Sequence, residues 1–292
     1  MSPFSGYQNV VGNLGSIQNK GFEIGLNSIN VVGKNFFWST NFTLGYNKNK
    51  VIRIESLGTI ATGTEMISQR YVAGYPAFSL FAFDYAGLNN NGDPQIRLAD
   101  GTITTDPVAS KATDVKFMGT TQPLWAGGLS NGFSYRDFSL NVNLVYNLGH
   151  VMFRDVNTFW SEPMYDNVHA EFADRWKVRG DENKTNIPRY IGNKAENSDR
   201  NTTYYTAANI NVFNASFVKV RDITLAYNLP EKLINQLKVG AITFRAQVSN
   251  LMLWKANKLG IDPEFQDSGL YGSGRTLRTG QGSLTLGAHV SF

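Results

Sequence analysis

The 292-residue sequence contains no cysteine, only three histidines and few charged residues, 17% in all. Without cysteine the chain can form no disulfide, no thiolate metal site and no thiol nucleophile. Charged residues make up about 25% of an average soluble domain, so their scarcity is unusual. The net charge of +4 is spread along the whole chain, which gives no argument for nucleic-acid binding.

Long apolar runs are also missing. A transmembrane helix needs about 18 or more consecutive apolar residues, and the sequence has no such run. Residues 1–15 lack the basic start and the apolar stretch of a signal peptide. Asn, Gly, Thr, Ser and Tyr are frequent in place of Lys and Glu, and these residues are poor helix formers. Abundant aromatic residues, 13%, argue against chain-wide disorder.

The dominant sequence pattern is an alternation of apolar and polar residues with a period of two. Between 36 and 48, for example, Trp38, Phe42 and Tyr46 alternate with polar residues such as Asn41. This is the pattern of antiparallel strands with one apolar and one polar face. The predicted strands are 20–31, 36–48, 66–73, 77–88, 125–135, 138–149, 212–228, 238–251 and 280–292.

Strand length and loop length together indicate a particular kind of β protein. Strands of about 10–13 residues exceed the usual 5–6 of globular proteins. Short turns alternate with long polar loops, and the long loops are 48–65, 89–124, 150–212 and 251–279. Short turns on one rim and long loops on the other are the rule in outer-membrane barrels, whereas such long loops are uncommon inside compact soluble domains.

The height of one strand agrees with this interpretation. The eight steps from Trp38 to Tyr46 measure about 26 Å, or about 20 Å in height when tilted by roughly 40°. An apolar barrel band is about 25 Å tall. We therefore expect an all-β fold, an antiparallel transmembrane β-barrel segment of about nine strands. The alternative is a soluble or secreted β-sandwich that binds glycans at the cell surface, in which the aromatic residues fill the core.

The strand count leaves two matters open. Residues 66–73 and 77–88 could be two strands or one bent strand. Nine is an odd number, and single-chain bacterial barrels usually have an even number of strands. Together with the lack of a signal peptide, this leads us to expect that an N-terminal part of the protein precedes the sequence.

Several segments resemble the C-terminal half of the barrel in SusC/RagA-type TonB-linked outer-membrane transporters. Their order along the chain is NLGSIQNKGFE (13–23), FWSTNF (37–42), NKNKV (47–51), GYP (74–76), FAFDYAG (81–87), Trp176, IPR (187–189), ASFVKVRDITLAYNLP (215–230), NL (250–251), GIDPE (260–264), GRT (274–276) and the terminal Phe292. The segments extend over nearly the whole sequence, and it is their order and spacing that make the resemblance specific.

The resemblance implies that residues 1–292 are the C-terminal portion of a 22-stranded barrel. The plug, the TonB-contacting segment and the signal peptide of such a transporter are not in this sequence. It further implies a cell outer membrane location in a Gram-negative, Bacteroidetes-like bacterium. The implied partners are a SusD-like lipoprotein, the TonB–ExbB–ExbD complex through the missing N-terminal part, and the barrel-insertion machinery. The implied cargo is an oligosaccharide or a peptide.

The sequence offers little for catalysis, and we predict neither an enzyme nor a cofactor or metal site. His150, His169 and His289 lie far apart, in no nucleophile or zinc spacing. Asp262-Pro263-Glu264 could be a carboxylate pair, but we favour a loop in which the acids are solvated or act as caps. The run 89–94 resembles a degenerate Asp/Asn/Gly loop of the family, and it lacks the final Glu of a calcium loop.

The 150–212 loop is rich in aromatic residues beside amide and charged groups. Flat rings with polar neighbours suit sugar rings, which have apolar CH faces and hydroxyl rims. The candidate ligand-contacting residues are Phe159, Trp160, Tyr165, Trp176 and Tyr190. The alternative is that such rings pack the loop on itself or against a lipoprotein lid.

The last strand carries the clearest mechanism. Leu284, Leu286 and Val290 alternate with polar residues, and the chain stops on Phe292. This resembles the signal that the barrel-insertion machinery reads. Across the strands, the last one included, we expect the polar set to line the barrel lumen: Glu23, Asn27, Asn41, Asn47, Asn141, Asn143, Arg245, Gln247 and His289.

Overall fold

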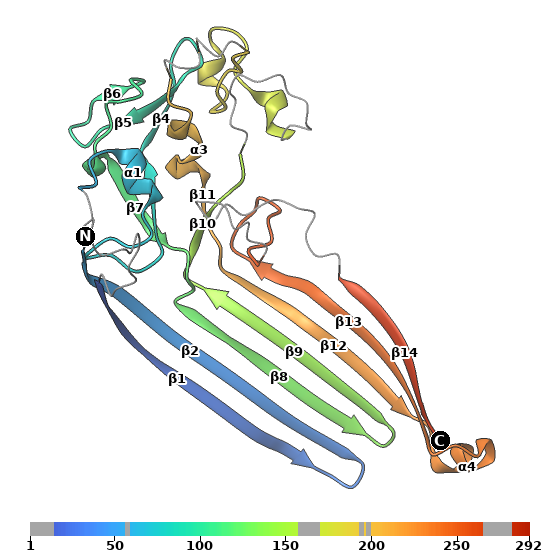
Figure 1. Ribbon diagram of the computed structural model, residues 1–292. Helices are drawn as coiled ribbons and strands as arrows, with labels where there is room; N and C mark the ends of the chain where they lie inside the picture. The colour runs from blue at the N-terminus through green and yellow to red at the C-terminus, as the bar shows by residue number, and fades with distance from the viewer. Residues whose placement is uncertain (1–14, 56–58, 157–169, 193–195, 197–199, 265–281) are drawn as a thin grey trace, which may run out of the picture.

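A computed structural model describes residues 15–55, 59–156, 170–192, 196, 200–264 and 282–292. Its main feature is one tilted antiparallel sheet of seven long strands, with a layer of small elements beyond one end (Figure 1). In spatial order the strands are β1 (Gly15–Val32), β2 (Phe36–Ile54), β8 (Trp125–Tyr135), β9 (Phe138–Leu148), β12 (Phe217–Asn228), β13 (Ala241–Lys255) and β14 (Ser283–Ser291).

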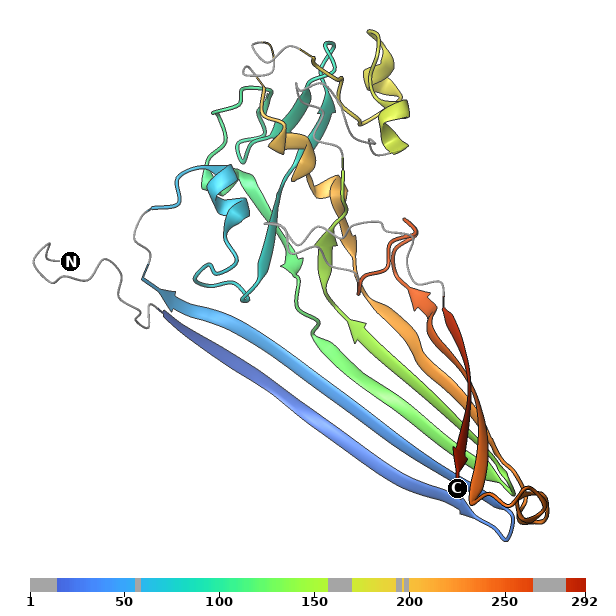
Figure 2. The ribbon, with the colours of Figure 1, turned by 45° about the vertical axis from the view of Figure 1, so that its right-hand side comes forward.

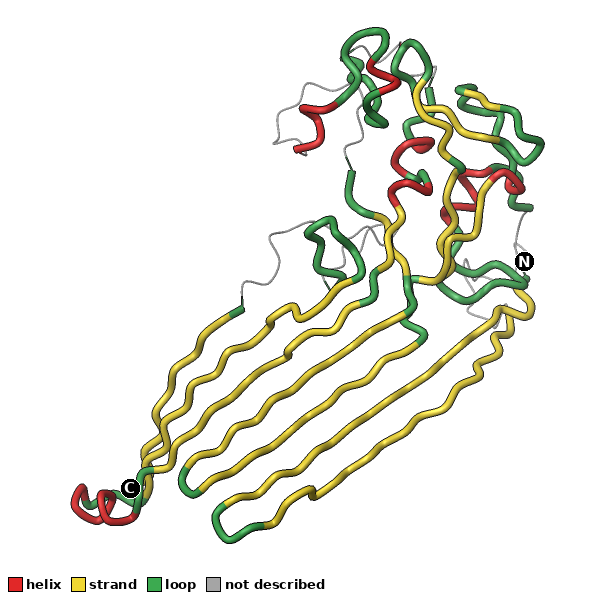
Figure 3. Tube along the Cα trace, turned by 180° about the vertical axis from the view of Figure 1, so that it is seen from behind, coloured by secondary structure: helices red, strands yellow, loops and turns green. Residues whose placement is uncertain are grey.

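The tight connections all lie at one end of the sheet (Figures 1 and 3). Between β1 and β2 the Gly33 amide donates to the Phe36 carbonyl at 2.7 Å. The β8–β9 turn places Arg136 at φ 54°, in the left-handed region. The β12–β13 connection includes the short helix α4 (Glu231–Leu237). The short turns predicted on one rim are therefore confirmed, and we call this end the turn side.

The long connections fold into the layer at the opposite end, the loop side (Figure 2). Its elements are α1 (Gly63–Ser68), β3 (Ser79–Phe83), β4 (Tyr85–Leu88), β5 (Pro94–Arg97), β6 (Ile103–Thr104), β7 (Val115–Thr120), β10 (Val151–Phe153), α3 (Thr203–Thr206) and β11 (Val212–Asn214). The 3-10 turns are Ala112–Asp114, Ala170–Asp174, Asp181–Asn183 and Asn209–Asn211. The layer has a hydrophobic core of its own, in which Phe83 meets Tyr204 edge to face at a ring distance of 4.8 Å.

The prediction of wall strands at 66–73 and 77–88 is wrong. Residues 63–68 form α1, which begins with a capping box between Thr62 and Glu65. Residues 79–83 form β3, which pairs with β7 in a small separate sheet. Every residue of β3 is buried, because both of its faces pack inside the layer, and a wall strand would have one face toward lipid. The wall therefore has seven described strands rather than nine.

The two faces of the long sheet differ sharply. One face carries large apolar residues that stay exposed, such as Leu26 at 56%, Leu284 at 66% and Leu286 at 73%. The opposite face carries Asn, Ser, Thr and Gly along the same strands. An exposed apolar surface of this extent fits a lipid environment. The β-sandwich alternative requires a second sheet over the apolar face. In the described part of the chain no such sheet covers it.

Two aromatic rows border the apolar face. On the turn side, direct strand pairing aligns the lower row: Phe36, Tyr135, Phe138, Tyr227 and Phe244. On the loop side, the upper row consists of Phe22, Tyr46 and Trp125, with Tyr46 and Trp125 ring centroids 4.5 Å apart. The ten steps from Phe36 to Tyr46 correspond to about 25 Å in height at roughly 40° tilt. That is the spacing of the two aromatic girdles of a membrane barrel.

These features identify the sheet as an antiparallel segment of a transmembrane β-barrel wall. Its two edges, β1 and β14, are not paired with each other among the described residues, so the described wall is open.

No helix in the described ranges is both long and apolar enough to cross a membrane.

Candidate functional site

The polar face of the wall carries one continuous row of directly paired polar residues. We call it the polar row; its members, from β1 to β12, are Asn27, Asn41, Ser130, Asn143 and Asp222. Asn41 Nδ2 donates to Asn27 Oδ1 at 2.6 Å, and Asn143 Nδ2 donates to Asp222 Oδ1 at 2.9 Å. Strand register places the whole predicted lumen set on this same face, including Arg245, Gln247 and His289 on β13 and β14.

A hollow of about 500 Å³ lies over the first four members of the polar row. Ser28, Ser39, Thr40, Asn131 and Asn141 add to its polar lining, and none of its lining residues is charged. Amide and hydroxyl groups can both donate and accept hydrogen bonds. The hollow therefore suits a neutral polyhydroxylated or amide-bearing molecule better than a charged one.

At the loop end of the polar face, Lys219 of β12 forms a buried ion cluster. Its side chain is 2% exposed, and Nζ donates to Asp262 Oδ2 at 2.9 Å and to Glu264 Oε2 at 2.7 Å. Arg221 also pairs with Glu264. Burial alone raises the pKa of Glu264, but the hydrogen bonds from Arg221 and Lys219 outweigh it and hold that pKa below its usual value.

This cluster corrects one detail of the sequence interpretation. Asp262 and Glu264 have a structural role, as favoured. Lys219 holds both carboxylates, so Asp262 is buried in an ion pair rather than solvated, and its Oδ1 also accepts from the Glu264 amide at 3.0 Å. Asn257 Nδ2 and Lys255 Nζ each donate to the Ile261 carbonyl at 3.1 Å. The segment 256–264 is thus fastened onto the wall. Lys219 lies among valines and Phe217 in the sequence, and nothing local marked its partners more than 40 residues later.

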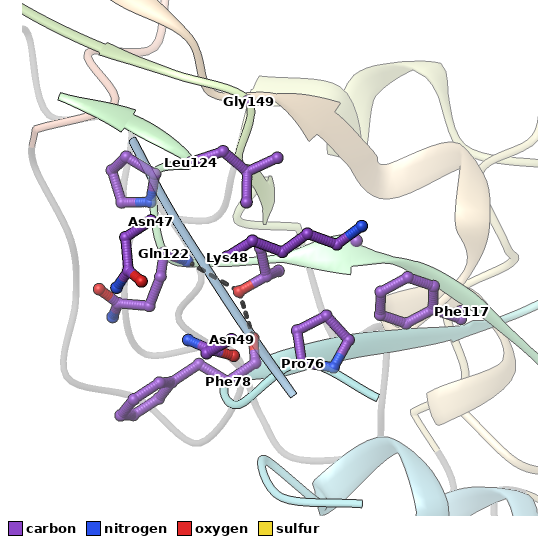
Figure 4. Close-up of a pocket in the computed structure, with 12 residues that line it drawn as sticks. Asn47, Lys48, Asn49, Pro76, Phe78, Phe117, Gln122, Leu124 and Gly149 are labelled. Carbon is purple, nitrogen blue, oxygen red and sulfur yellow. Dashed lines mark hydrogen bonds between the residues drawn. The ribbon is translucent and has the colours of Figure 1, made fainter. Parts of the chain in front are cut away.

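A second cavity, of about 460 Å³, lies on the loop side, where β2 extends beyond the first residue of β8 (Figure 4). Phe78, Phe117 and Leu124 give it an apolar part, while Asn47 and Gln122 add amides. Two hydrogen bonds connect its frame: Asn49 Oδ1 accepts from the Ala77 amide at 2.7 Å, and Thr120 Oγ1 donates to the Ala77 carbonyl at 3.1 Å. Rings beside amides at a wall rim can bind sugar or peptide segments.

Two of the five predicted ligand aromatics lie in the described layer, and each has a packing partner. The Trp176 ring lies on the backbone of Gly92, where an added Cβ would come within 2.5 Å of it. Its Nε1 donates to Glu182 at 2.9 Å. Tyr190 meets the Phe172 ring edge to face at 5.8 Å. These contacts favour the packing alternative for both residues, while ligand contact stays a prediction. Phe159, Trp160 and Tyr165 lie outside the described residues.

The run 89–94 is closed by its own groups. Asn89 Oδ1 accepts from the amides of Asn91 and Asp93, both at 2.9 Å. The Asp93 carboxylate faces Arg189 at 3.0 Å and Arg200 at 3.7 Å. Two guanidinium groups of the chain thus neutralise the Asp93 carboxylate. In the described ranges, no three His, Asp or Glu side chains come together as a metal site would require.

The two histidines among the described residues, His150 and His289, lie apart and form no site. His150 is 2% exposed, and burial lowers its pKa to about 4. Its Nδ1 has no hydrogen-bond partner among the described residues. His289 lies on the polar face of β14, opposite Thr243. His169 lies outside the described residues.

The predicted insertion signal is laid out as the alternation suggests. Leu284, Leu286 and Val290 all point to the apolar face of the edge strand β14. Phe292 follows this strand and is 98% exposed. Whether insertion depends on these four residues stays a prediction.

Comparison with known proteins gives a consistent result. The chain matches no protein-family profile. It is 30% identical over 327 aligned positions to TonB-dependent receptor P26 of Formosa agariphila, covering 99% of this chain and 30% of that receptor. It is 24% identical to TonB-dependent receptor SusC of Bacteroides thetaiotaomicron, covering 87% of this chain and 25% of SusC. The chain thus spans less than a third of the length of these two relatives.

Solved structures agree on the fold. The chain superposes on a RagAB peptide transporter structure with a TM-score of 0.68 at 22% identity, over 96% of this chain and 30% of that chain. The "closed-closed" state of the RagAB peptide importer gives a TM-score of 0.69. Together with the receptor sequences, these likenesses confirm the resemblance drawn from the sequence segments.

Proposed function

Because the chain resembles SusC/RagA-type TonB-dependent receptors along nearly its whole length, we propose that it is the C-terminal part of the barrel of an outer-membrane importer. Its role is binding and gated passage rather than bond chemistry, and the relatives above are named as receptors and transporters. The observation that carries this proposal is the division of one wall into an apolar face between two aromatic rows and a polar face with an uncharged hollow. Soluble proteins rarely expose a contiguous apolar surface of this size.

The proposed cargo is an oligosaccharide. The lining of the hollow is uncharged, and its amides and hydroxyls match the hydroxyl rim of a sugar. A peptide is the second candidate, because RagAB, to which the wall is similar in fold, is a peptide transporter. Passage is proposed to be energised by TonB–ExbB–ExbD through the N-terminal part, with a SusD-like lipoprotein over the loop side.

Uptake in the producing bacterium tests the function. Deleting the gene should abolish uptake of one oligosaccharide class from a panel that also contains peptides, and a proton-motive uncoupler should have the same effect. Loss of peptide uptake alone would replace the first cargo by the second. Unchanged uptake of every compound would refute the transport proposal.

Variants in the hollow refine that test. Asn41→Ala with Asn141→Ala should lower the uptake rate at limiting substrate while the amount of barrel in the membrane stays constant. Asn235→Ala, on exposed α4 at the turn side, is the matched control.

Co-purification of a lipoprotein with the tagged barrel tests the proposed SusD-like partner. Absence of any co-purified lipoprotein in mild detergent would count against that partner.

A further inference from the structure

Three lysines stand on the apolar face directly above the upper aromatic row. Strand pairing sets Lys20 of β1 opposite Lys48 of β2, and Gln18 opposite Lys50. The next pair toward the turn side is Phe22 with Tyr46, whose rings are 5.7 Å apart. Lys20, Lys48 and Lys50 therefore share the face of that aromatic pair, and they begin about 5 Å above it in height.

The pairing of Lys20 with Lys48 is unfavourable by itself. Directly opposed residues of an antiparallel pair have Cβ atoms about 5 Å apart, and like charges there destabilise the sheet. All three lysines are exposed. None of the ion pairs found among the described residues includes any of the three. The one acid beside them in sequence, Glu23, alternates onto the polar face with Gly45 as its strand partner.

The level of the three lysines relative to the membrane indicates which kind of anion can bind them. Aromatic rows mark the level at which hydrocarbon gives way to lipid headgroups. Lysine stems can lie along apolar surface while the ammonium groups reach the headgroup layer. Lysine clusters at that level attract anionic lipid headgroups. The occupant must therefore be anionic and held at the membrane surface from outside the barrel.

We propose that Lys20, Lys48 and Lys50 form a binding surface for a phosphate-bearing lipid headgroup of the loop-side leaflet. The headgroup phosphate lies between the ammonium groups and removes the repulsion between Lys20 and Lys48. The surface lies on the outside of the wall, away from the polar hollow that is proposed to carry cargo, and Lys48 also lines the second cavity at the rim (Figure 4). The inference rests on the membrane placement proposed above, and it makes no use of the transport step.

Native mass spectrometry of the whole delipidated barrel, with phosphatidic acid as the probe lipid, tests the proposal. The wild-type barrel should retain phosphatidic acid over phosphatidylcholine, and raising the salt concentration should weaken retention. Replacing all three residues, in K20Q/K48Q/K50Q, should lower the affinity about tenfold or more. The control K34Q/K232Q/K238Q removes the same charge from exposed turn-side positions and should bind like wild type. Equal binding by K20Q/K48Q/K50Q, or by phosphatidylcholine, would overturn the proposal.

A second measurement separates a lipid site from a purely structural one. In lipid-free detergent Lys20→Gln should leave the melting temperature unchanged or raise it, since one charge of the repelling pair is gone. In phosphatidic acid bilayers the same variant should melt lower than wild type. A lower melting temperature in both media would overturn the proposal, as would inorganic phosphate competing fully with the lipid. Uptake is not a readout, so failure of the transport proposal would leave both results interpretable.

Discussion

Lys219 and Asp262 are joined by a buried ion pair of 2.9 Å, with exposed side-chain fractions of 2% and 8%. The pair ties the segment after β13 to the polar face of β12, so a loop and the wall share one electrostatic contact. Taking a charge out of water is costly, and a buried pair is tolerated only with good geometry and further hydrogen bonds. Glu264 supplies the second contact to the ammonium group.

Lys219→Met should therefore open the segment 256–264. It leaves Asp262 without its cation in a buried place, which costs about 3–5 kcal/mol. Hydrogen exchange of the amides between 255 and 262 should accelerate. Arg221→Gln is the control, because Arg221 is 46% exposed and exposed pairs contribute at most about 1 kcal/mol. Equal exchange rates in the two variants would contradict the importance of the buried pair.

The direction in which neighbouring residues face predicts a contrast between Phe42 and Asn41. Phe42 pairs with Leu26 and Leu129 on the apolar face, at mid-height between the aromatic rows. Lysine there costs about 2–4 kcal/mol at mid-depth. Asn41→Lys adds the same charge at the same height on the polar face. We expect Phe42→Lys to reduce the heat-modifiable, membrane-inserted fraction far more than Asn41→Lys, and equal losses would contradict the assignment of the faces.

The end of the chain gives a prediction about assembly. Deleting Phe292 from the full-length parent should lower its outer-membrane level, since the terminal aromatic completes the proposed insertion signal. Leu286→Asn should act in the same direction through the apolar face of β14. Thr285→Ala, on the polar face of that strand, is the control and should leave the level unchanged. Normal amounts of inserted protein without Phe292 would argue against the signal.

Burial of His150 predicts a pH dependence. Its folded-state pKa of about 4 lies below the unfolded value of 6.5, so the unfolded chain binds more protons between these values. The contribution of His150 to the free energy of unfolding is therefore fully present above about pH 6.5. It falls as the pH drops toward 4, and the loss is about 2 kcal/mol at pH 5. Urea unfolding of the refolded barrel at pH 7 and pH 5 measures this loss. His150→Phe should reduce it, and an unchanged pH dependence in that variant would refute the assignment.

The sequence revealed the wall better than the layer, for a physical reason. In a strand with one face to lipid and one to a polar lumen, apolar and polar residues alternate strictly. The sequences of β2, β9 and β14 show this alternation. The residues of β3 also alternate in part, but both faces are buried among neighbours brought together by tertiary packing. Thus Phe81 and Phe83 looked like wall residues and are core residues of the layer. The lysine pair Lys20–Lys48 and the cluster at Lys219 needed strand register, which a single sequence does not give.

The central claim is that one face of the sheet meets lipid and the other a polar lumen, and spin-label accessibility tests it most directly. The chain has no cysteine, so single cysteines can be placed at each position from 36 to 46 in the full-length barrel in bilayers. The account predicts a strict period of two. Labels at even positions such as Leu44 should collide with oxygen, and labels at odd positions such as Thr43 with a water-soluble nickel complex. Aqueous accessibility at every position, or no alternation along β2, would contradict it.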